Sequence, residues 1–513
     1  MKKILSLLMV AAMLLGAVAL VSCGDGKDPT GPSNNTNTPG TSTGERIPLD
    51  LPDVNYTVSG EATIYNILEW ACGGQNEPTP GGWIPWEEGD VDTLDGDMLG
   101  KAVFDRNAWV EQEYGVEITK EYASVEVAPT FITRLRNNMD TGDDLYQLVT
   151  MRSRNLISFV QEELLFDMNT YKDTILHTDQ PWWVQSSVEA YTLGSHLYAA
   201  CTEFLLRDKG ATAALYFNQQ IVKDYQDELP DFFQLVDDKE WTFEQMIDAC
   251  EVVSGDMDGD DEMASPNDMW GIVGGDDPVF FLYAATGNRF AHIDDAGYLE
   301  YDFGYNGETV IVMQEIFEDV MYADWYLNAA LAEDQEIISK TEGDVFKDGY
   351  SLFSGSMVKG VTHLSDMQST YGILPYPMYN DDQERYYSLV WIHHDSTVAI
   401  PAHAKNTEMC ATILEALSWE SYYSVYPTFY ETILLDRAAK DEDSRRMLEI
   451  IFNTRLYDPG QYWDTITGLQ HSEGLLRLTS TGNADIASVW GRFESKVRDC
   501  VDTINAMVQD LEG

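Results

Sequence analysis

An acidic segment at residues 256–268 has the composition and spacing of a cation site. Carboxylates recur at alternate positions of this segment and once more at its end: Asp256, Asp258, Asp260, Glu262 and Asp268. Calcium gathers about six to eight oxygen ligands from tight loops with this spacing. The glycine usual at the sixth position is replaced by Asp261, and the closing acid comes one residue late. We therefore expect either a structural Ca²⁺ site or a solvated acidic turn, and no other cofactor.

A second set of residues that could bind a ligand lies beside the predicted strands. Open α/β sheets bind ligands beyond the carboxyl ends of their strands. Aromatic rings stack on the C–H faces of sugars, and charged side chains bond their hydroxyls. We expect a carbohydrate site formed by Glu69, Trp70, Arg152, Arg154, Glu203, Trp270, Trp391, His394 and Asp395. Each tryptophan could instead pack in a core, as could Trp182 and Trp183. The cluster of His393, His394 and Asp395 could bind a metal, but loop histidines with satisfied hydrogen bonds are favoured, because neighbours on a strand point to opposite faces.

Catalytic motifs are scarce. The one GxSxG match, at residues 40–44, lies in a polar stretch and lacks the strand–turn–helix context of a nucleophile elbow. Neither an HExxH zinc motif nor a P-loop occurs. With 87 acidic residues, carboxylate pairs of the glycosidase kind occur at nearly any spacing by chance. We therefore expect a protein that is not an enzyme, with a surface glycoside hydrolase as one alternative and a surface adhesion or scaffold protein as another.

The elements that would position these residues alternate between strand and helix. Apolar spacing predicts strands at 62–70, 116–122 and 145–151, and helices at 98–114 and 128–139. Gly115 is expected to cap the first of these helices. The alternation predicts mostly parallel sheets flanked by helices. Roughly 450 residues follow the N-terminal region, more than one core usually organises, so two lobes are expected.

Ordered landmarks between residues 60 and 430 resemble the extracellular solute-binding proteins of the sugar-binding, maltose-binding-protein-like family. They include YGVEITKEYAS, NNMDTGDDLYQLVT, WTFEQ from Trp241, YGILPYP from Tyr371 and VAIPA from Val398. The resemblance implies a type II periplasmic-binding-protein-like fold with a hinge between lobes. It implies capture of a mono- or oligosaccharide in an interlobe cleft and delivery to an ABC permease. It also places Glu203 near a carboxylate that the family uses and Arg154 near a sugar-contacting turn.

The same landmarks suggest lobe boundaries. We expect lobe 1 at 59–195, lobe 2 at 196–345, a return to lobe 1 at 346–402 and a helical C-terminal segment of lobe 2 at 403–513. The stretch after about Ser424 does not map to the family. Trp391 would lie on lobe 1, with Trp270 facing it from lobe 2.

The N-terminus predicts export and lipidation. Lys2 and Lys3 precede an apolar run that ends in Leu-Val-Ser-Cys at Cys23, which is typical of a signal peptide and matches a bacterial lipobox. We expect a lipoprotein signal peptide at 1–23, lipidation of Cys23 and a disordered tether at 24–58. A single membrane-spanning anchor is the alternative. The protein would then sit at the outer face of the bacterial cytoplasmic membrane, extracellular and lipid-anchored.

The net charge and the cysteine spacing argue against several kinds of partner and structural site. A net charge of −56 argues against nucleic acid or anionic lipid as a partner. Besides Cys23 the chain has five widely spaced cysteines and no CxxC, so neither a disulfide framework nor a structural zinc site is expected. We expect a monomer whose partners are a small solute and the membrane permease.

Overall fold

The computed structural model describes residues 46–71, 98–124, 130–257, 259, 261, 263, 268–304, 307–328, 342–364, 366–435, 442–462, 464–470 and 473–513. All of them belong to one compact unit, Thr36–Gly513. Cys23, Asp258, Asp260 and Glu262 lie outside the described residues.

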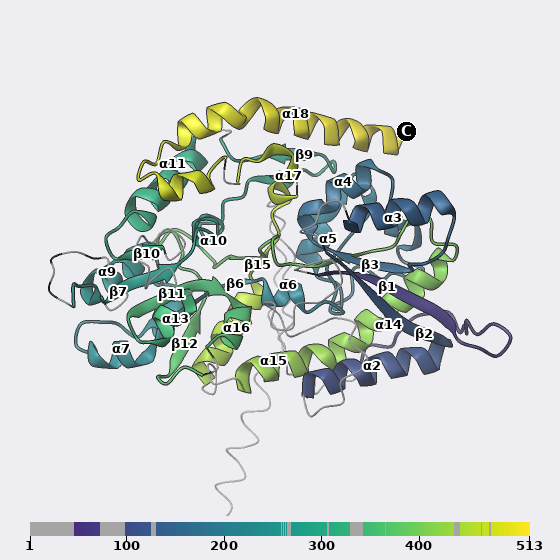
Figure 1. Ribbon diagram of the computed structural model, residues 1–513, viewed down its shortest axis with the longest axis horizontal. Helices are drawn as coiled ribbons and strands as arrows, with labels where there is room; N and C mark the ends of the chain where they lie inside the picture. Colours follow the sequence, from purple (N-terminus) through teal and green to yellow (C-terminus); the bar gives the residue numbers. More distant parts are fainter. Residues whose placement is uncertain are drawn as a thin grey trace, which may run out of the picture. The chain divides into compact units, whose positions relative to one another are not determined.

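The first sheet has four strands in the order β14-β3-β1-β2. Its strands are β1 (Thr63–Ala71), β2 (Val116–Ser124), β3 (Leu148–Met151) and β14 (Thr397–Ala399). Both β2 and β3 pair with β1 in parallel, and β14 runs antiparallel to β3. The start of β14 therefore lies beside the carboxyl end of β3. Helices α2 (Met98–Tyr114) and α14 (Thr407–Tyr423) cover one face and α3 (Thr130–Thr141) covers the other (Figure 1).

The turn between α2 and β2 needs glycine. Gly115 has φ +67°, and a Cβ there would meet Asn55 Oδ1 at 2.5 Å. Its amide donates to the Glu111 carbonyl at the end of the helix. The predicted helix and its glycine cap are confirmed.

The second sheet has five strands in the order β10-β7-β11-β6-β12. They are β6 (Ala213–Asn218), β7 (Trp270–Gly274), β10 (Tyr326–Asn328), β11 (Ser351–Met357) and β12 (Tyr371–Leu374). The β10–β7 and β7–β11 pairs are parallel, whereas β11–β6 and β6–β12 are antiparallel. This sheet is therefore mixed rather than mostly parallel. Its helices include α9 (Phe243–Val253), α10 (Pro278–Ala285) and α16 (Glu442–Asn453) (Figure 1).

Two hydrophobic cores accompany the two sheets. The first core surrounds residues such as Leu68, Leu148 and Leu414, and the second surrounds Leu215 and Phe353. Strands β11 and β12 belong to the second sheet, so of the predicted lobe 1 return at 346–402 only β14 joins the first. Conversely, α14 packs in the first core, although 403–513 was assigned to lobe 2. The difference arises because β11 and β12 both pair with β6 of the second sheet before the chain returns to the first sheet at β14.

Helix α18 (Ile486–Glu512) contributes to both cores. Its first half places Ile486, Val489, Trp490 and Val497 in the second core. Its second half places Cys500, Val501, Ile504 and Val508 in the first core. The Asn505 amide donates to the Leu299 carbonyl at 2.9 Å, and the Ser195 amide donates to Glu512 Oε1 at 2.6 Å.

Residues 46–58 belong to the folded body rather than to the predicted tether. The Arg46 guanidinium bonds Glu420 on α14 at 2.7 Å, and the Trp419 indole donates to the Ile47 carbonyl at 2.8 Å. Four apolar side chains pack against the first core: Leu49, Leu51, Val54 and Tyr56. The apolar side chains of residues 46–58 give this stretch a surface to bury. Among the described helices, none combines the length and apolar character needed to span a bilayer.

Candidate functional site

Six of the nine predicted ligand residues lie around the carboxyl ends of β1 and β3. They are Glu69, Trp70, Arg152, Arg154, His394 and Asp395. Direct contacts join these segments: the Ser153 amide, in the turn η1 (Ser153–Asn155), donates to Asp395 Oδ1 at 3.1 Å. Arg154 bonds the His393 ring at 2.7 Å. The antiparallel pairing of β14 with β3 brings residues 393–396 to this edge.

Trp70 is the centre of this cluster. Its side chain is 1% exposed, and its indole N–H donates to Ser396 Oγ at 3.2 Å. The Arg152 and Arg207 guanidinium carbons lie 4.3 and 4.4 Å from its ring centroid. Arg207 also donates to Glu69 Oε1 at 3.4 Å. The ring therefore holds two cations, a cation–π arrangement that is strongest when water is excluded.

Burial shifts the pKa values of Asp395 and His394 in opposite directions. Burial raises the pKa of Asp395 to about 7, although the hydrogen bonds from Ser153 and the Arg152 charge oppose it. Burial lowers the pKa of His394 well below its usual range, and the charges of Lys359, Arg152, His393 and Arg207 lower it further. The imidazole of His394 is therefore neutral near pH 7, in a neighbourhood of positive charge.

Sequence reasoning missed the short helix α6 (Arg207–Gly210), which lies where the chain passes from the first core to the second. A four-residue helix has no usable apolar period. The signal available was three consecutive charged residues, Arg207 to Lys209, embedded between the apolar runs FLL and ATAALY. Charged residues within apolar sequence are buried only when they are paired, so such a triplet indicates a buried ionic network.

The predicted ligand residue Glu203 belongs to that network. Lys209 Nζ lies 3.0 Å from Glu203 and 3.4 Å from Asp208, and all three are buried. Arg455, in β15 (Arg455–Leu456), bonds Asp208 at 3.0 Å, and the Tyr457 hydroxyl donates to the same oxygen at 3.1 Å. Glu203 is thus a partner in a buried ionic network that adjoins Arg207.

Trp270 lies in the second sheet, the lobe predicted for it, whereas Trp391 does not lie on the lobe predicted for it. Trp391 packs in the second core rather than on lobe 1: it stacks on Phe280 with centroids 5.3 Å apart and donates to Asp277 Oδ2 at 3.0 Å. Trp270 is the first residue of β7, at the amino end of that strand, and is buried opposite Ser351. Both rings are buried in the second core, where large aromatic side chains stabilise most, and the Trp391 ring also lies 4.8 Å from the His393 ring at the candidate site.

Trp182 and Trp183 pack in the first core. Their indole N–H groups donate to the two oxygens of Glu415, each at 2.8 Å. The His177 amide also donates to this buried carboxylate, at 3.3 Å. These two tryptophans are therefore structural.

The described part of the acidic loop is organised by its own backbone. Asp256 accepts from the Gly259 and Asp261 amides at 2.6 and 2.8 Å, and buried Asp268 accepts from Met257 at 3.0 Å. Asp261, where a calcium loop usually has glycine, has φ +65° and so adopts the left-handed conformation that this position requires. Within the described residues no group of three metal-binding side chains comes together.

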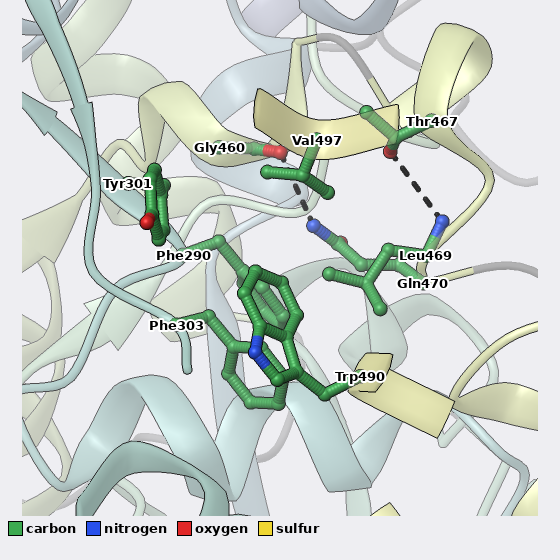
Figure 2. Close-up of a pocket in the computed structure, with 9 residues that line it drawn as sticks. All are labelled: Phe290, Tyr301, Phe303, Gly460, Thr467, Leu469, Gln470, Trp490 and Val497. Carbon is green, nitrogen blue, oxygen red and sulfur yellow. Dashed lines mark hydrogen bonds between the residues drawn. The ribbon is translucent and has the colours of Figure 1, made fainter. Parts of the chain in front are cut away.

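A small cavity lies beside α18 and away from the candidate residues. Figure 2 shows its lining, in which the Gln470 amide donates to the Gly460 carbonyl at 3.3 Å and the Leu469 amide donates to Thr467 at 3.4 Å. Phe290, Phe303 and Trp490 form its aromatic side. With about 10 Å³ it holds roughly one water molecule, far below what a sugar needs.

Comparisons with known proteins identify the fold. No family model and no curated protein matches the chain. An ABC substrate-binding protein from Listeria monocytogenes, solved with cycloalternan, superimposes with TM-score 0.52 at 12% identity, covering 88% of this chain and 100% of its own. A cyclo/maltodextrin-binding protein with maltotetraose gives 0.50 at 12%, covering 88% and 99%. A maltose/maltodextrin-binding domain from Bdellovibrio bacteriovorus with maltotriose gives 0.51 at 11%, covering 86% and 100%. The chain has the two-lobed, type II periplasmic-binding-protein-like fold.

Proposed function

We propose that this protein is the substrate-binding component of an ABC importer that captures an extracellular mono- or oligosaccharide. The observation that carries the proposal is the gathering of six candidate residues at the carboxyl ends of β1 and β3, beside the segment α6 that joins the two cores. Ligands bind open α/β sheets at this edge. Structures of the same fold hold cycloalternan, maltotetraose and maltotriose, which supports a carbohydrate.

The arrangement suits binding better than turnover. Arg152 and Arg154 are half-buried near the end of β3, and buried Asp395 and Ser396 accept hydrogen bonds from the Ser153 amide and the Trp70 indole. Because these polar groups are already held in place, they can orient a polyhydroxylated ligand without further reorganisation. A ligand that touches both lobes would favour the closed form, which the permease would recognise.

A ligand screen with two readouts tests this proposal. Mono- and oligosaccharides are added to the purified protein, and the melting temperature and the radius of gyration by solution scattering are recorded. The expected result is a raised melting temperature together with compaction for at least one sugar. Steady conversion of a sugar into product, without compaction, would support the glycoside hydrolase instead.

Membrane attachment is the second part of the proposal. The Leu-Val-Ser-Cys sequence supports lipidation of Cys23 and display of the body at the outer face of the cytoplasmic membrane. Cys23→Ala should release the protein from washed membranes into the medium. Retention of this variant would favour a spanning anchor.

Calcium in the 256–268 loop is the third part. The left-handed backbone at Asp261 and the buried Asp268 carboxylate support it, whereas the amide bonds already made by Asp256 occupy part of its capacity. Chelation should lower the melting temperature, and Ca²⁺ should restore it better than equimolar Mg²⁺, which prefers a smaller octahedral shell. An unchanged melting temperature would indicate a solvated acidic turn.

A further inference from the structure

A second segment besides α18 packs in both cores. It is the hairpin formed by β8 (Ala291–Ile293) and β9 (Leu299–Tyr301), which pair antiparallel. At the base of the hairpin, Phe290 and Phe303 pack in the second core, whereas Leu299 packs in the first. Helix α18 runs along β9 (Figure 1). Both segments therefore extend from the second lobe, which is built on the five-stranded sheet, to the first lobe, which is built on the four-stranded sheet.

The hairpin and the C-terminal half of α18 are joined by a pair of hydrogen bonds. The Leu299 amide donates to Asn505 Oδ1 at 2.9 Å, and Asn505 Nδ2 donates to the Leu299 carbonyl, also at 2.9 Å. A side-chain amide that bonds both backbone groups of one residue fixes the position of the helix on the hairpin. The two segments thus form one unit, which we call the latch: residues 291–301 and 500–512.

The latch docks on a tight turn of the first lobe. The Gly194 amide of this turn donates to the Gly297 carbonyl at 2.9 Å, which joins the turn to the tip of the hairpin. The next amide, that of Ser195, donates to Glu512 Oε1 at 2.6 Å, which joins the turn to the end of α18. Both parts of the latch therefore hold the same two residues of the first lobe.

An apolar seam lies next to this turn. Ile157 of the first lobe lines one side of a small cavity, and Leu299 and Ile504 of the latch line another. Ile157 belongs to α4 (Leu156–Gln161), which follows directly on η1, the turn that carries Arg154. The latch therefore packs on the element next to the candidate site.

Docking of the latch opposes movement between the lobes. Helix α18 is continuous from Ile486 in the second core to Val508 in the first, so the lobes separate only if the latch leaves the first lobe or the helix bends. At the candidate site, Trp70 is 1% exposed and Asp395 is fully buried. A solute reaches these side chains only after the elements around them have moved.

We propose that the latch holds the two lobes together in the solute-free protein, and that its release from the first lobe opens the candidate site. Two hydrogen bonds and one apolar seam form a contact that local opening can break without unfolding either core. The part of the latch in solute exchange rests on the proposed function, whereas its restraint on the lobes does not.

Gly297→Ala tests the latch without removing any side chain. Gly297 has φ +83°, and a Cβ there would lie 2.5 Å from Gly194 Cα and 2.7 Å from Gly194 N, so the hairpin and the turn must move apart. Gly349→Ala is the matched control, because Gly349 has φ +87° and open space around the added Cβ. Both variants carry the backbone strain of a left-handed alanine, and only the first disturbs the docking contact.

Two measurements on the solute-free protein report the state of the latch. Solution scattering should give a larger radius of gyration for Gly297→Ala than for the unaltered protein and for Gly349→Ala. In hydrogen exchange, the Gly194 and Ser195 amides of Gly297→Ala should exchange about tenfold or more faster, because the latch supplies the acceptors of both.

Glu512→Ala gives a second test at the end of α18. It removes the acceptor of the Ser195 amide, whose exchange should become about threefold or more faster. Glu494→Ala is its control, because Glu494 lies on the same helix and pairs with Arg498 one turn away.

An unchanged radius of gyration in Gly297→Ala would overturn the inference and leave solute capture intact. Equal changes in Gly297→Ala and Gly349→Ala would indicate general destabilisation and also count against it. If Gly297→Ala does not fold, unchanged Ser195 exchange in Glu512→Ala overturns the inference. A ligand screen in which no sugar binds would instead contradict the proposed function, and the restraint on the lobes would stand.

Discussion

Two buried clusters in this protein contain the same residue types but have different partners. One centres on Glu415, which receives the indole N–H groups of Trp182 and Trp183. The other centres on Trp70, which donates to Ser396 and holds the guanidinium groups of Arg152 and Arg207. Each cluster includes tryptophan, a carboxylate and a histidine, so composition does not separate them.

The two clusters differ in the parts of the molecule that supply their residues. The Glu415 cluster lies within the first core, and its carboxylate is bonded by indole and amide donors. The Trp70 cluster combines β1 and β3 of the first sheet with α6, and Leu206, the residue before α6, packs in the second core. Charged groups supplied by both cores can respond to movement between them, whereas a carboxylate bonded within one core mainly stabilises that core. This difference can be tested with variants.

The largest expected effect is on stability, in Glu415→Ala. Two buried indole donors would lose their acceptors, and each such loss costs about 1–3 kcal/mol, so the free energy of unfolding should fall by roughly 3–5 kcal/mol. Urea unfolding followed by circular dichroism measures it. Solute affinity of the folded fraction should be unchanged. A loss below about 1 kcal/mol would contradict the structural role.

Trp70→Leu should reduce solute affinity more than it reduces stability, the reverse of Glu415→Ala. It removes the ring that positions Arg152 and Arg207, and solute affinity should fall by about 1–3 kcal/mol in calorimetry. Trp391→Ala is the comparison variant, because Trp391 belongs to the second core and its truncation should lower stability, by about 3–5 kcal/mol. If Trp70→Leu binds solute normally, the Trp70 cluster is only packing.

The histidines of the two clusters should give opposite pH dependences. The hydrogen bond with Glu415 raises the pKa of His177, so its contribution to stability is complete below pH about 6.5 and is lost as pH rises through the folded-state pKa. Burial lowers the pKa of His394, so its contribution is present above pH about 6.5 and is lost as pH falls. Unfolding free energies of His177→Gln and His394→Gln, each subtracted from those of the unaltered protein across pH 5–8, should slope in opposite directions. Parallel slopes would disprove the contrast.

The smallest effect is expected near the C-terminal end of α14. Glu420 pairs with Arg46 at 2.7 Å, and the arginine side chain is 47% exposed. Exposed pairs contribute about 0–1 kcal/mol, so Glu420→Ala should barely change the urea midpoint. Compared with Glu415→Ala on the same helix, it isolates the effect of burial. A loss as large as that of Glu415→Ala would mean that docking of residues 46–58 supports the first core.

Sequence reasoning was most reliable where local periodicity is strong. Helix Met98–Tyr114 and its Gly115 cap, and the strands on either side of them, were predicted within a few residues. The fold class, taken from ordered landmarks, is confirmed by the likeness to solved structures. The convergence of Trp70, Arg152 and Asp395 followed from their places beside strand ends.

Predictions from the sequence were weaker where contacts between distant parts of the chain determine the position of a residue. The destination of Trp391 depends on contacts with Asp277 and Phe280, more than a hundred positions away, and no local pattern encodes them. The same holds for the lobe assignment of β11 and β12, which is fixed by their pairing with β6. Lipidation of Cys23 and calcium binding remain predictions.

Helix α18 has a consequence for the order in which the protein is assembled during its synthesis. It is made after every other described element, yet it supplies Trp490 to the second core and Ile504 to the first. Both cores therefore keep an apolar surface open until this helix emerges from the ribosome. Neither core can therefore be completed before the last described helix of the chain has been made.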